Sequence, residues 1–569
     1  MEKPWLKFYE PHVPEHLDYP DAIMPAVLEE TARKYPDHTA LIFKDTKLTF
    51  REYNDAVDRF AAALQGLGVE KGDRVAIHLP NCPQFPIAYY AILRIGGIVV
   101  PCNPIYTARE MKHQLSDSGA EVIVPPHDLY PLIKQIRAET KLRHVIVAKI
   151  KTYFPPFLKL LFTLLLEKKK GHKVDISGDA NTYWFQDVLA GAPAKPSPVE
   201  VTWDDTAVLM YTGGTTGVSK GAQLTHKNIL ANAYQCKVWM NAQEAQGDIS
   251  VTALPLYHSY AMTTCMNFDT IAGVAMLLIP DPRDLEDVLK SITKHKPTFY
   301  PGVPAMYVAI NNYPHLEKYD VSSLVACISG AAGLPVEVQQ KFQKLTGARL
   351  VEGYGLSEAS PVTHANPIFG ENRVGTIGLP WPDTEVKIVD TDTGEKELGV
   401  GEAGELCIRG PQVMKGYWNM PTETANTLRD HGDGGAPWLH TGDIAVMDED
   451  GYFKIVDRKK DMILGAGGYN IYPREVEDVL YEHPKVLEVA AAGIPVEGKG
   501  ERVKVYVVLK EGETATEEEI IQFCKENLAP YKVPKFVEFR DELPKTMVGK
   551  ILRRVLVEEE RKKLAEQQQ

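Results

Sequence analysis

Short apolar runs alternate with helical patterns along the first third of the chain. Strand-like runs at 75–79, 98–102, 121–124 and 144–148 are separated by helical stretches at 84–94, 108–118 and near 129–139. Strands separated by helices indicate βαβ units, in which the strands are parallel and the crossovers right-handed. A second run of the same kind extends from Ala207 to Gly353. The pattern therefore predicts two stacked α/β subdomains.

The pattern changes after Gly375. Short alternating strands at 385–389 and 404–409, punctuated by Gly and Pro, are typical of a small antiparallel barrel or sheet. A charged run, DRKKD at 457–461, then precedes a compact α+β pattern; by itself such a run could equally be a solvated turn. We expect an α/β protein whose large N-terminal domain, 1–457, combines two stacked α/β subdomains with a small β-barrel-like subdomain. A small α+β domain, 458–569, completes the chain.

One stretch, 153–170, interrupts the alternation and reads YFPPFLKLLFTLLLEKKK. Its two prolines suit the start of a helix. The helix would be apolar except for a narrow polar stripe formed by Lys159, Thr163 and Glu167. It is too short to span a bilayer, at about 1.5 Å per residue against a hydrocarbon core of about 30 Å.

Two interpretations of this helix remain open. In the first, the helix lies in a membrane interface, with 168–170 at anionic headgroups. The side chains that would then enter the lipid are Phe157, Leu160, Leu161, Leu164 and Leu165. In the second, the helix is buried within the protein or at the contact of a homodimer.

Composition narrows the class of protein. The chain has 569 residues, of which 44% are hydrophobic and 24% charged, as in ordinary globular proteins. A net charge of -13 argues against a nucleic-acid partner, which requires a dense basic face. Seven cysteines without any C-x-x-C spacing indicate neither a zinc site nor a disulfide framework. Without a signal peptide or a long apolar run, we expect a cytoplasmic protein, peripheral on the inner membrane face if 153–170 binds lipid.

A glycine-rich loop, YTGGTTGVSKG at 211–221, directly follows the strand-like run 207–210. Glycines let successive N–H groups converge on an anion, hydroxyl side chains add donors, and a lysine adds charge. The loop is not a P-loop, because its lysine stands three residues after Gly217 and is followed by glycine. A flexible surface loop is the alternative. The candidate phosphate-binding residues are Thr212, Gly213, Gly214, Thr215, Thr216, Gly217 and Lys220.

Three further strings lie where parallel strands are expected to end, the edge at which open α/β sheets bind ligands. They are LPLYHSYAM at 254–262, SGAAGLP at 329–335 and VEGYGLSE at 351–358. The small residues of the second string leave room for a flat ring, and Tyr354 offers a stacking face. Glu358 offers a hard oxygen ligand for Mg²⁺. Close packing of strand on helix explains the small residues equally well, but not the glutamate.

The second half of the chain adds three strings. LHTGD at 439–443 ends in a carboxylate that can accept two hydroxyls, although TGD alone is too short to carry weight. LGAGGYNIYPREVE at 464–477 follows the charged run, and PKTMVGKILR at 544–553 lies near the end of the chain.

The strings, in this order between Leu41 and Arg554, resemble those of the adenylate-forming superfamily, which includes acyl-CoA synthetases, luciferases and the adenylation domains of peptide synthetases. Luciferase-like members carry lysine where this chain has Leu464, so the resemblance is to acyl-CoA synthetases of the fatty-acid type. It implies a two-step reaction: a carboxylate attacks the α-phosphorus of Mg·ATP, and the thiol of coenzyme A then displaces AMP. It also implies that the C-terminal domain is mobile, with a hinge near 457–461.

The resemblance assigns a role to each matching residue. Lys550 would bridge the carboxylate and the α-phosphate, and His258 would lie between ATP and the acyl group. Thr212 and Glu358 would hold the metal, and Gly467 and Gly468 would leave a tunnel for pantetheine. The remaining nucleotide contacts would be Gly330, Ala331, Ala332, Glu352, Gly353, Tyr354, Gly355, Ser357, Asp443 and Arg458, with Lys460 at the hinge.

The expected substrates are ATP, coenzyme A and a medium- to long-chain fatty acid, with Mg²⁺ as cofactor. An enzyme that adenylates another carboxylic acid, or that loads a separate carrier protein, is the alternative. Against amino-acid substrates, YHSY replaces the Asp-bearing motif that holds an α-amine. A non-enzymatic binding protein is disfavoured because binding alone would not require Lys550, Glu358 and Asp443 together.

Overall fold

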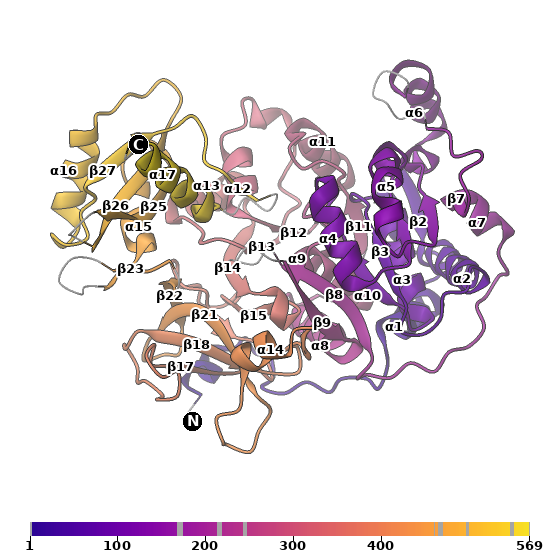
Figure 1. Cartoon of the computed structure of the whole chain (residues 1–569), viewed down its shortest axis with the longest axis horizontal. Helices are drawn as coiled ribbons and strands as arrows, with labels where there is room; N and C mark the ends of the chain where they lie inside the picture. The colour runs from indigo at the N-terminus through magenta and orange to yellow at the C-terminus, as the bar shows by residue number, and fades with distance from the viewer. Residues whose placement is uncertain are drawn as a thin grey trace.

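The computed structural model describes residues 3–167, 174–212, 219–242, 247–459, 461–464, 470–496, 500–546 and 551–567. Two large sheets, a smaller antiparallel sheet and a C-terminal sheet with its helices make up these residues. Figure 1 shows the C-terminal part, in yellow, at one end of the molecule beside α12 and α13. The expected α/β class, with a large N-terminal part and a smaller C-terminal domain, is confirmed.

The first large sheet has eight strands in the order β19-β9-β8-β4-β3-β5-β6-β7. Strands β3 to β8 pair in parallel, and β9 and β19 add an antiparallel edge. The bounds are β3 (Arg74–Ile77), β4 (Ile98–Pro101), β5 (Val122–Val124), β6 (His144–Val147), β7 (Thr182–Trp184), β8 (Thr206–Thr212), β9 (Lys220–Thr225) and β19 (Gly416–Tyr417).

The second large sheet has nine strands in the order β16-β15-β14-β13-β12-β10-β11-β1-β2. Its middle strands are parallel, and an antiparallel strand lies at each side. The bounds are β1 (Thr39–Phe43), β2 (Thr46–Thr49), β10 (Ile249–Thr252), β11 (Ala275–Leu278), β12 (Phe299–Gly302), β13 (Ala326–Ser329), β14 (Arg349–Gly355), β15 (Val362–Ala365) and β16 (Leu379–Pro380).

The assignment of strands to the two sheets differs from the sequence expectation. The second run was expected to begin at Ala207, but β8, which contains this residue, pairs in parallel with β4 of the first sheet. Conversely, β1 comes from the start of the chain and pairs with β11 of the second sheet. Periodicity identifies strands, whereas the partner of a strand is set by contacts that are distant in sequence.

Alternate residues of the strands pack into different cores, which explains how the two large sheets stack on each other. On β1, Leu41 and Phe43 join the core between the two sheets, whereas Ile42 faces the outer helices of the second sheet. On β3, Val75 and Ile77 face the central core. Ala76, which lies between them, belongs to an outer core under α4 and α5. Because successive side chains in a strand point to opposite faces, both sheets are covered on both sides.

Three of the helices begin at a threonine that caps them. Thr49, Thr107 and Thr225 each accept a hydrogen bond from the backbone of the first turn of α2, α4 and α8, in reciprocal capping boxes. The bounds in the N-terminal part are α1 (Met24–Lys34), α2 (Phe50–Gly66), α3 (Gln84–Arg94), α4 (Ala108–Ser118), α5 (Tyr130–Ile136), α6 (Pro156–Leu161), α7 (Phe185–Gly191), α8 (His226–Trp239), α9 (Ser259–Ala261), α10 (Phe268–Ala272), α11 (Leu285–His295), α12 (Pro304–Asn311), α13 (Val336–Thr346) and α14 (Pro421–Thr427).

Shorter helical turns fill several connections. The 3₁₀ turns are η1 (Pro4–Phe8), η2 (His127–Leu129), η3 (Arg137–Glu139), η4 (Ile150–Tyr153), η7 (Leu316–Lys318) and η8 (Ser357–Ala359). Two segments have π-helical hydrogen bonding, η5 (Phe162–Leu166) directly after α6 and η6 (Met262–Asn267) directly after α9.

The small third subdomain is an antiparallel five-stranded sheet, as its sequence pattern predicts. Its strands are β17 (Glu385–Val389), β18 (Gly404–Arg409), β20 (Leu428–Arg429), β21 (Trp438–Met447) and β22 (Phe453–Arg458). The predicted domain boundary falls at the end of β22.

The C-terminal domain is a three-stranded sheet with helices on both faces. Alternation on β26 again separates two cores: Val505 and Val507 pack with α15 and α16, and Tyr506 packs with α17. The bounds are β23 (Ile463–Leu464), β24 (Asn470–Ile471), α15 (Pro473–Tyr481), β25 (Val486–Val496), β26 (Gly500–Leu509), α16 (Glu517–Asn527), β27 (Phe536–Phe539) and α17 (Arg553–Gln567).

Within the described ranges, every helix is too short or too polar to cross a bilayer.

Candidate functional site

Three strings that are far apart in the sequence meet at one cleft. Strands β13 and β14 are parallel neighbours, so 329–335 and 351–358 leave the sheet at the same edge. The segment 254–262 follows β10 in the same sheet. Of the residues predicted from the sequence, those that line the cleft are His258, Gly330, Ala331, Gly353, Tyr354, Gly355 and Ser357.

Two glycines in the cleft are required by close approach. A Cβ on Gly355 would lie 2.2 Å from the carbonyl oxygen of Pro361, so any side chain there would displace backbone. A Cβ on Gly330 would lie 3.1 Å from the ring of Tyr260, which donates its hydroxyl to Ile328 O at 2.8 Å and is therefore held in place. Both positions therefore lack room for a side chain.

His258 stands at the junction of loop and helix, as expected. Its side chain accepts a hydrogen bond from the backbone N–H of Tyr260 at 3.3 Å and caps α9. The next residue, Ser259, lies with its hydroxyl 3.1 Å from that of Ser357. Two of the predicted strings are therefore joined directly, and the half-buried imidazole lines the cleft beside them.

A hydrogen-bonded chain joins Tyr354, Asp443 and Arg458. The hydroxyl of Tyr354 donates to Oδ2 of Asp443 at 2.6 Å, and Nε of Arg458 lies 3.0 Å from Oδ1 of the same carboxylate. Asp443 and Arg458 face each other across β21 and β22. Burial and the neighbouring Asp443 carboxylate raise the pKa of Tyr354 well above its ordinary value, so the phenol stays a donor. The carboxylate is held from two sides, with lone pairs left to accept further hydroxyls.

Tyr417 is a site residue that sequence reasoning missed. Its hydroxyl donates to Oε1 of Glu358 at 2.7 Å, and Nζ of Lys220 lies 5.2 Å from the centre of its ring. Lys220 also pairs with Glu423. Residues 416–417 reach this place by pairing with β9, so no short-range signal in the sequence could have identified Tyr417.

The candidate phosphate-binding residues, as far as they are described, lie next to Tyr417 and Glu358. Backbone positions Thr212 and Lys220 face each other across β8 and β9, on either side of the loop. The side chain of Thr212 lies outside the described residues. So do Gly213, Gly214, Thr215, Thr216 and Gly217, and also Lys460, Gly467, Gly468 and Lys550. Their roles stay predictions.

Glu352 points away from the cleft, although its neighbour Gly353 lines the cleft. Its carboxylate accepts a hydrogen bond from the backbone N–H of Leu334 at 3.2 Å and lies 3.7 Å from Nη2 of Arg474 in α15. Burial raises the pKa of Glu352 to about 7, and Arg474 opposes the shift. Its predicted contact with ATP is untested. Ala332, in the loop that follows β13, is exposed.

Charged residues cluster beside the predicted hinge, and their contacts with Asp457 cross the domain boundary. The backbone N–H of Arg474 donates to Asp457 at 2.8 Å, and burial raises the pKa of Asp457 to about 6. Arg553, which closes the lysine-bearing string 544–553, donates to Glu477 at 2.5 Å. Its guanidinium also lies 3.5 Å from Asp461. The C-terminal end of the lysine-bearing string is thereby held near the domain junction.

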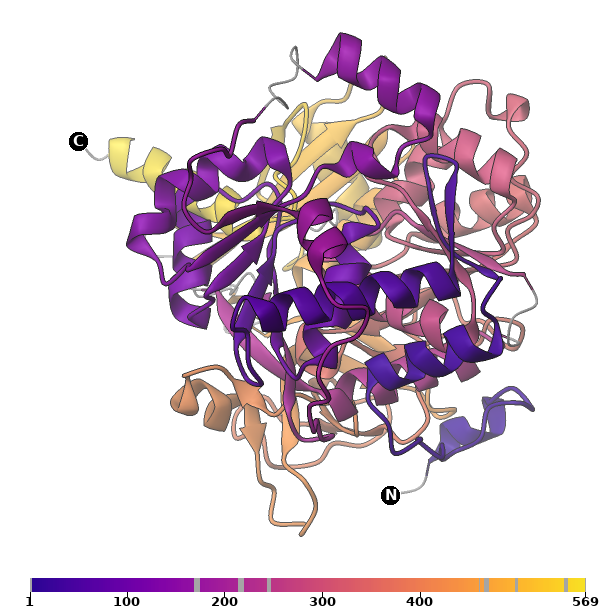
Figure 2. The ribbon, with the colours of Figure 1, turned by 90° about the vertical axis from the view of Figure 1, so that its right-hand side faces the viewer.

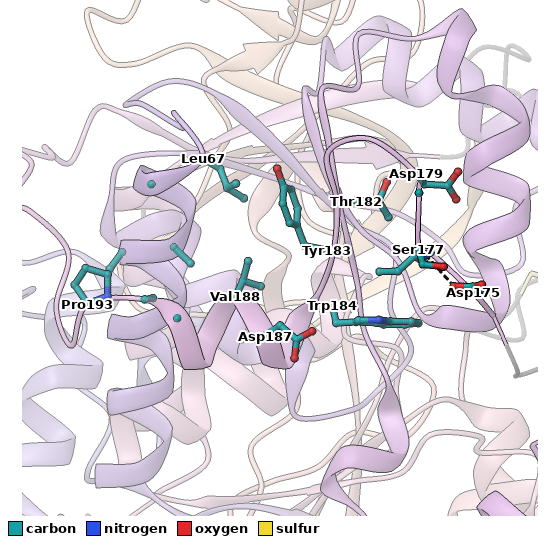
Figure 3. Close-up of a pocket in the computed structure, with 17 residues that line it drawn as sticks. Leu67, Asp175, Ser177, Asp179, Thr182, Tyr183, Trp184, Asp187, Val188 and Pro193 are labelled. Carbon is teal, nitrogen blue, oxygen red and sulfur yellow. Dashed lines mark hydrogen bonds between the residues drawn. The ribbon is translucent and has the colours of Figure 1, made fainter.

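A larger cavity of the described chain lies elsewhere. It measures about 700 Å³ and is formed by the end of α2, residues 175–184 and α7. Figure 3 shows Leu67 and Val188 on one side and Asp175 and Asp179 on the other. None of the predicted site residues lines it. Size alone would therefore misplace the site, which the convergence of polar groups identifies instead.

Comparison with known proteins agrees with this geometry. Residues 28–418 match the family described as AMP-binding enzyme, and residues 475–550 match the AMP-binding enzyme C-terminal domain. A long-chain-fatty-acid–CoA ligase of Bacillus subtilis (strain 168) is 48% identical over 561 residues, which cover 98% of this chain and 98% of the relative.

Solved structures agree as well. The anthranilate CoA ligase AuaEII in complex with anthranoyl-AMP superposes with a TM-score of 0.82 at 27% identity, covering 96% of this chain and 97% of its own. ATP-bound MatB from Rhodopseudomonas palustris gives 0.81 at 28% identity, covering 95% and 99%. With both parts matched and the relatives covered over nearly their whole length, the chain belongs to the AMP-binding enzyme family.

Proposed function

We propose that this protein is an ATP-dependent ligase that joins long-chain fatty acids to coenzyme A. The carboxylate oxygen of the acid forms a bond to the α-phosphorus of ATP as the bond to pyrophosphate breaks. The thiolate sulfur of coenzyme A then bonds to the acyl carbon, and AMP leaves. The observation that carries the proposal is the 48% identity, over almost the full chain, to a ligase named for this activity.

The cleft supports a nucleotide as the first substrate. We propose that adenine lies between the loop at 330–332 and Tyr354. Asp443, held by Tyr354 and Arg458, would then accept both ribose hydroxyls, because an ionised carboxylate is an acceptor only. The backbone N–H groups of 213–217 and the cation of Lys220 would receive the phosphates, where preorganised donors stabilise charge that develops in the transition state.

The donor set fits Mg²⁺. The ion usually takes one or two protein oxygens and completes its shell with phosphates and water. In the described part of the chain, His, Cys, Asp and Glu form no cluster of three or more that could hold a metal, whereas Glu358 has its carboxylate oriented by Tyr417. We propose Glu358 and Thr212 as the protein ligands. When bound, Mg²⁺ neutralises phosphate charge.

The two half-reactions divide the remaining residues. We propose that Lys550 bridges the attacking carboxylate and the α-phosphate in the first step. Gly467 and Gly468 would line the path of pantetheine in the second. Because two distant segments cannot occupy one small space together, the domain after 457–461 would rotate about Lys460 between the steps. His258, at the rim of the cleft, would separate ATP from the acyl group.

We also propose that the protein works at the surface of the membrane that holds its substrate. A homodimer stays a prediction, because the structure contains one chain.

The test is pyrophosphate release over a panel of acids: butanoate, octanoate, hexadecanoate, anthranilate and leucine, each with and without coenzyme A. We expect the highest kcat/KM with hexadecanoate, and acyl-CoA as the product. Release that is highest with anthranilate or leucine would refute the assignment. Adenylate that accumulates without thioester in the presence of coenzyme A would instead favour a separate carrier protein as acceptor.

A further inference from the structure

An apolar helical arm projects from the N-terminal part of the molecule. It consists of α6 and η5, residues 156–166, and both ribbon views show it at the edge of the protein (Figures 1 and 2). The side chains expected to enter lipid are all exposed, from 40% for Leu161 to 77% for Phe157. The full set is Phe157, Leu160, Leu161, Leu164 and Leu165.

Spacing places these five side chains on one face. Positions three and four apart are neighbours on a helix, so 157, 160, 161, 164 and 165 form a continuous apolar strip. An exposed apolar patch on this scale is typical of an interaction surface rather than of the ordinary surface of a monomer. The interpretation that the helix is buried within its own chain is therefore wrong.

The polar face of the arm, not the apolar one, is attached to the protein. Lys151 forms an ion pair with Glu167 at 2.7 Å and donates to the hydroxyl of Thr163 at 3.1 Å. The ring of Phe162 packs edge-on against Phe154, with centroids 5.6 Å apart. Thr163 and Glu167 of the predicted polar stripe, together with Phe162, thus anchor the arm, and the five apolar side chains face outward.

The charges of the sequence around the arm indicate what kind of surface covers the apolar strip. Residues 149–173 contain seven lysines and a single acid, Glu167, in a chain whose net charge is -13. That acid is paired with Lys151. A second copy of this chain would bring two basic arms together and repel itself, whereas anionic headgroups would be attracted. A basic amphipathic helix lies in an interface with its apolar face about 5–10 Å deep.

We propose that the arm is a lipid-insertion element that holds the enzyme on an anionic bilayer. Phe157 and the four leucines enter the interface, and the positive charge of the sequence around the arm attracts the anionic headgroups. The purpose of this contact rests on the proposed function, since a long-chain acid partitions into the bilayer, but the contact itself rests on the exposed strip and the local charge.

Vesicle co-sedimentation tests the proposal. The wild type is compared with Leu160→Glu/Leu164→Glu on vesicles of phosphatidylcholine and phosphatidylglycerol. The matched control is Leu345→Glu/Val400→Glu, which adds the same charge at exposed apolar positions away from the arm. We expect the arm variant to lose about tenfold or more in apparent affinity, and the control to match the wild type. Equal binding by the arm variant and the wild type would overturn the proposal.

Two further measurements separate lipid from a second protein copy and from the catalytic assignment. Lys168→Gln/Lys169→Gln/Lys170→Gln should weaken binding to anionic vesicles, and vesicles of phosphatidylcholine alone should bind the wild type less. A wild-type dimer that becomes monomeric in the arm variant, with unchanged vesicle binding, would overturn the proposal. Activity of the arm variant on octanoate in solution should equal that of the wild type. Loss of vesicle binding with retained activity supports the arm, and absence of ligase activity in all variants refutes only the proposed function.

Discussion

Replacing Tyr354 by Phe tests the proposed nucleotide site by removing a single hydroxyl group. The substitution removes the hydroxyl that donates to Asp443 at 2.6 Å and keeps the ring, which packs edge-on against His364 with centroids 5.9 Å apart. The ring face proposed to stack on adenine is therefore unchanged, while the Asp443 carboxylate, proposed to bind ribose, loses one of its two positioning partners.

The magnitude follows from the charge on the acceptor. A hydrogen bond to an ionised group contributes about 1.5–3 kcal/mol, and about 1.4 kcal/mol corresponds to a factor of ten in an equilibrium. We expect kcat/KM for ATP to fall about 10- to 100-fold in pyrophosphate release. The change should fall mainly on the KM for ATP, with the KM for the fatty acid within about twofold of the wild type.

Two controls make this result specific. Tyr307→Phe removes a buried hydroxyl that donates to Tyr300 O at 2.7 Å, and should lower stability without changing the KM for ATP. If the hydroxyl of Tyr354 acts through Asp443, adding Tyr354→Phe to Asp443→Asn should cost much less than it does alone. A KM for ATP equal to that of the wild type in Tyr354→Phe, or full additivity in the double variant, would refute the reasoning.

The remaining predictions concern the metal, the two half-reactions and pH. Lys550→Ala should abolish adenylate formation and largely spare thioester formation from supplied acyl-adenylate. The reason is that a cation about 4 Å from developing charge contributes about 4 kcal/mol at an effective dielectric near 20. Equal loss in both assays would exclude the role of Lys550 in the first step. Lys460→Pro should slow the second step selectively in single-turnover kinetics, and unchanged rates in both steps would argue against a hinge there. Glu358→Gln should raise the Mg²⁺ concentration needed for half-maximal pyrophosphate release, since an amide is a weaker ligand than a carboxylate; an unaltered Mg²⁺ titration would assign the metal to another residue. Burial raises the pKa of Glu352 from 4.5 to about 7, so the unfolded chain loses this proton at lower pH than the folded protein. The free energy of unfolding should therefore fall by about 3 kcal/mol as pH rises through that window. Glu352→Gln should reduce this fall when urea unfolding is measured at about pH 5 and pH 8, and an equal fall in the variant and the wild type would contradict the prediction.

Local signals were sufficient to predict several elements of the fold. The bounds of α3 and α4 agree with the prediction, and His258 lies at the turn into a helix. Capping residues such as Thr107 act over three or four positions, so the sequence displays them directly. The carboxyl-end location of 329–335 and 351–358 also followed from pattern alone, because parallel strands present these ends at a single edge.

Other features were decided only by contacts between distant segments. The pairing of β8 with the first sheet, the approach of Tyr417 to Glu358 and the turn of Glu352 toward Arg474 join positions far apart in the chain. Each depends on which surfaces meet after the helices and sheets have formed, and no periodicity records that choice.

The segment 153–167, which contains the arm, illustrates both halves of this division. Its sequence determined that one face would be apolar and a narrow stripe polar, because side-chain direction on a helix follows from spacing alone. Which face would meet solvent was left open, and the tertiary structure decided it: Lys151, from the preceding turn, pairs with Glu167 and directs the leucines outward. The sequence of a helix specifies its two faces, whereas the partner that covers each face belongs to the rest of the fold.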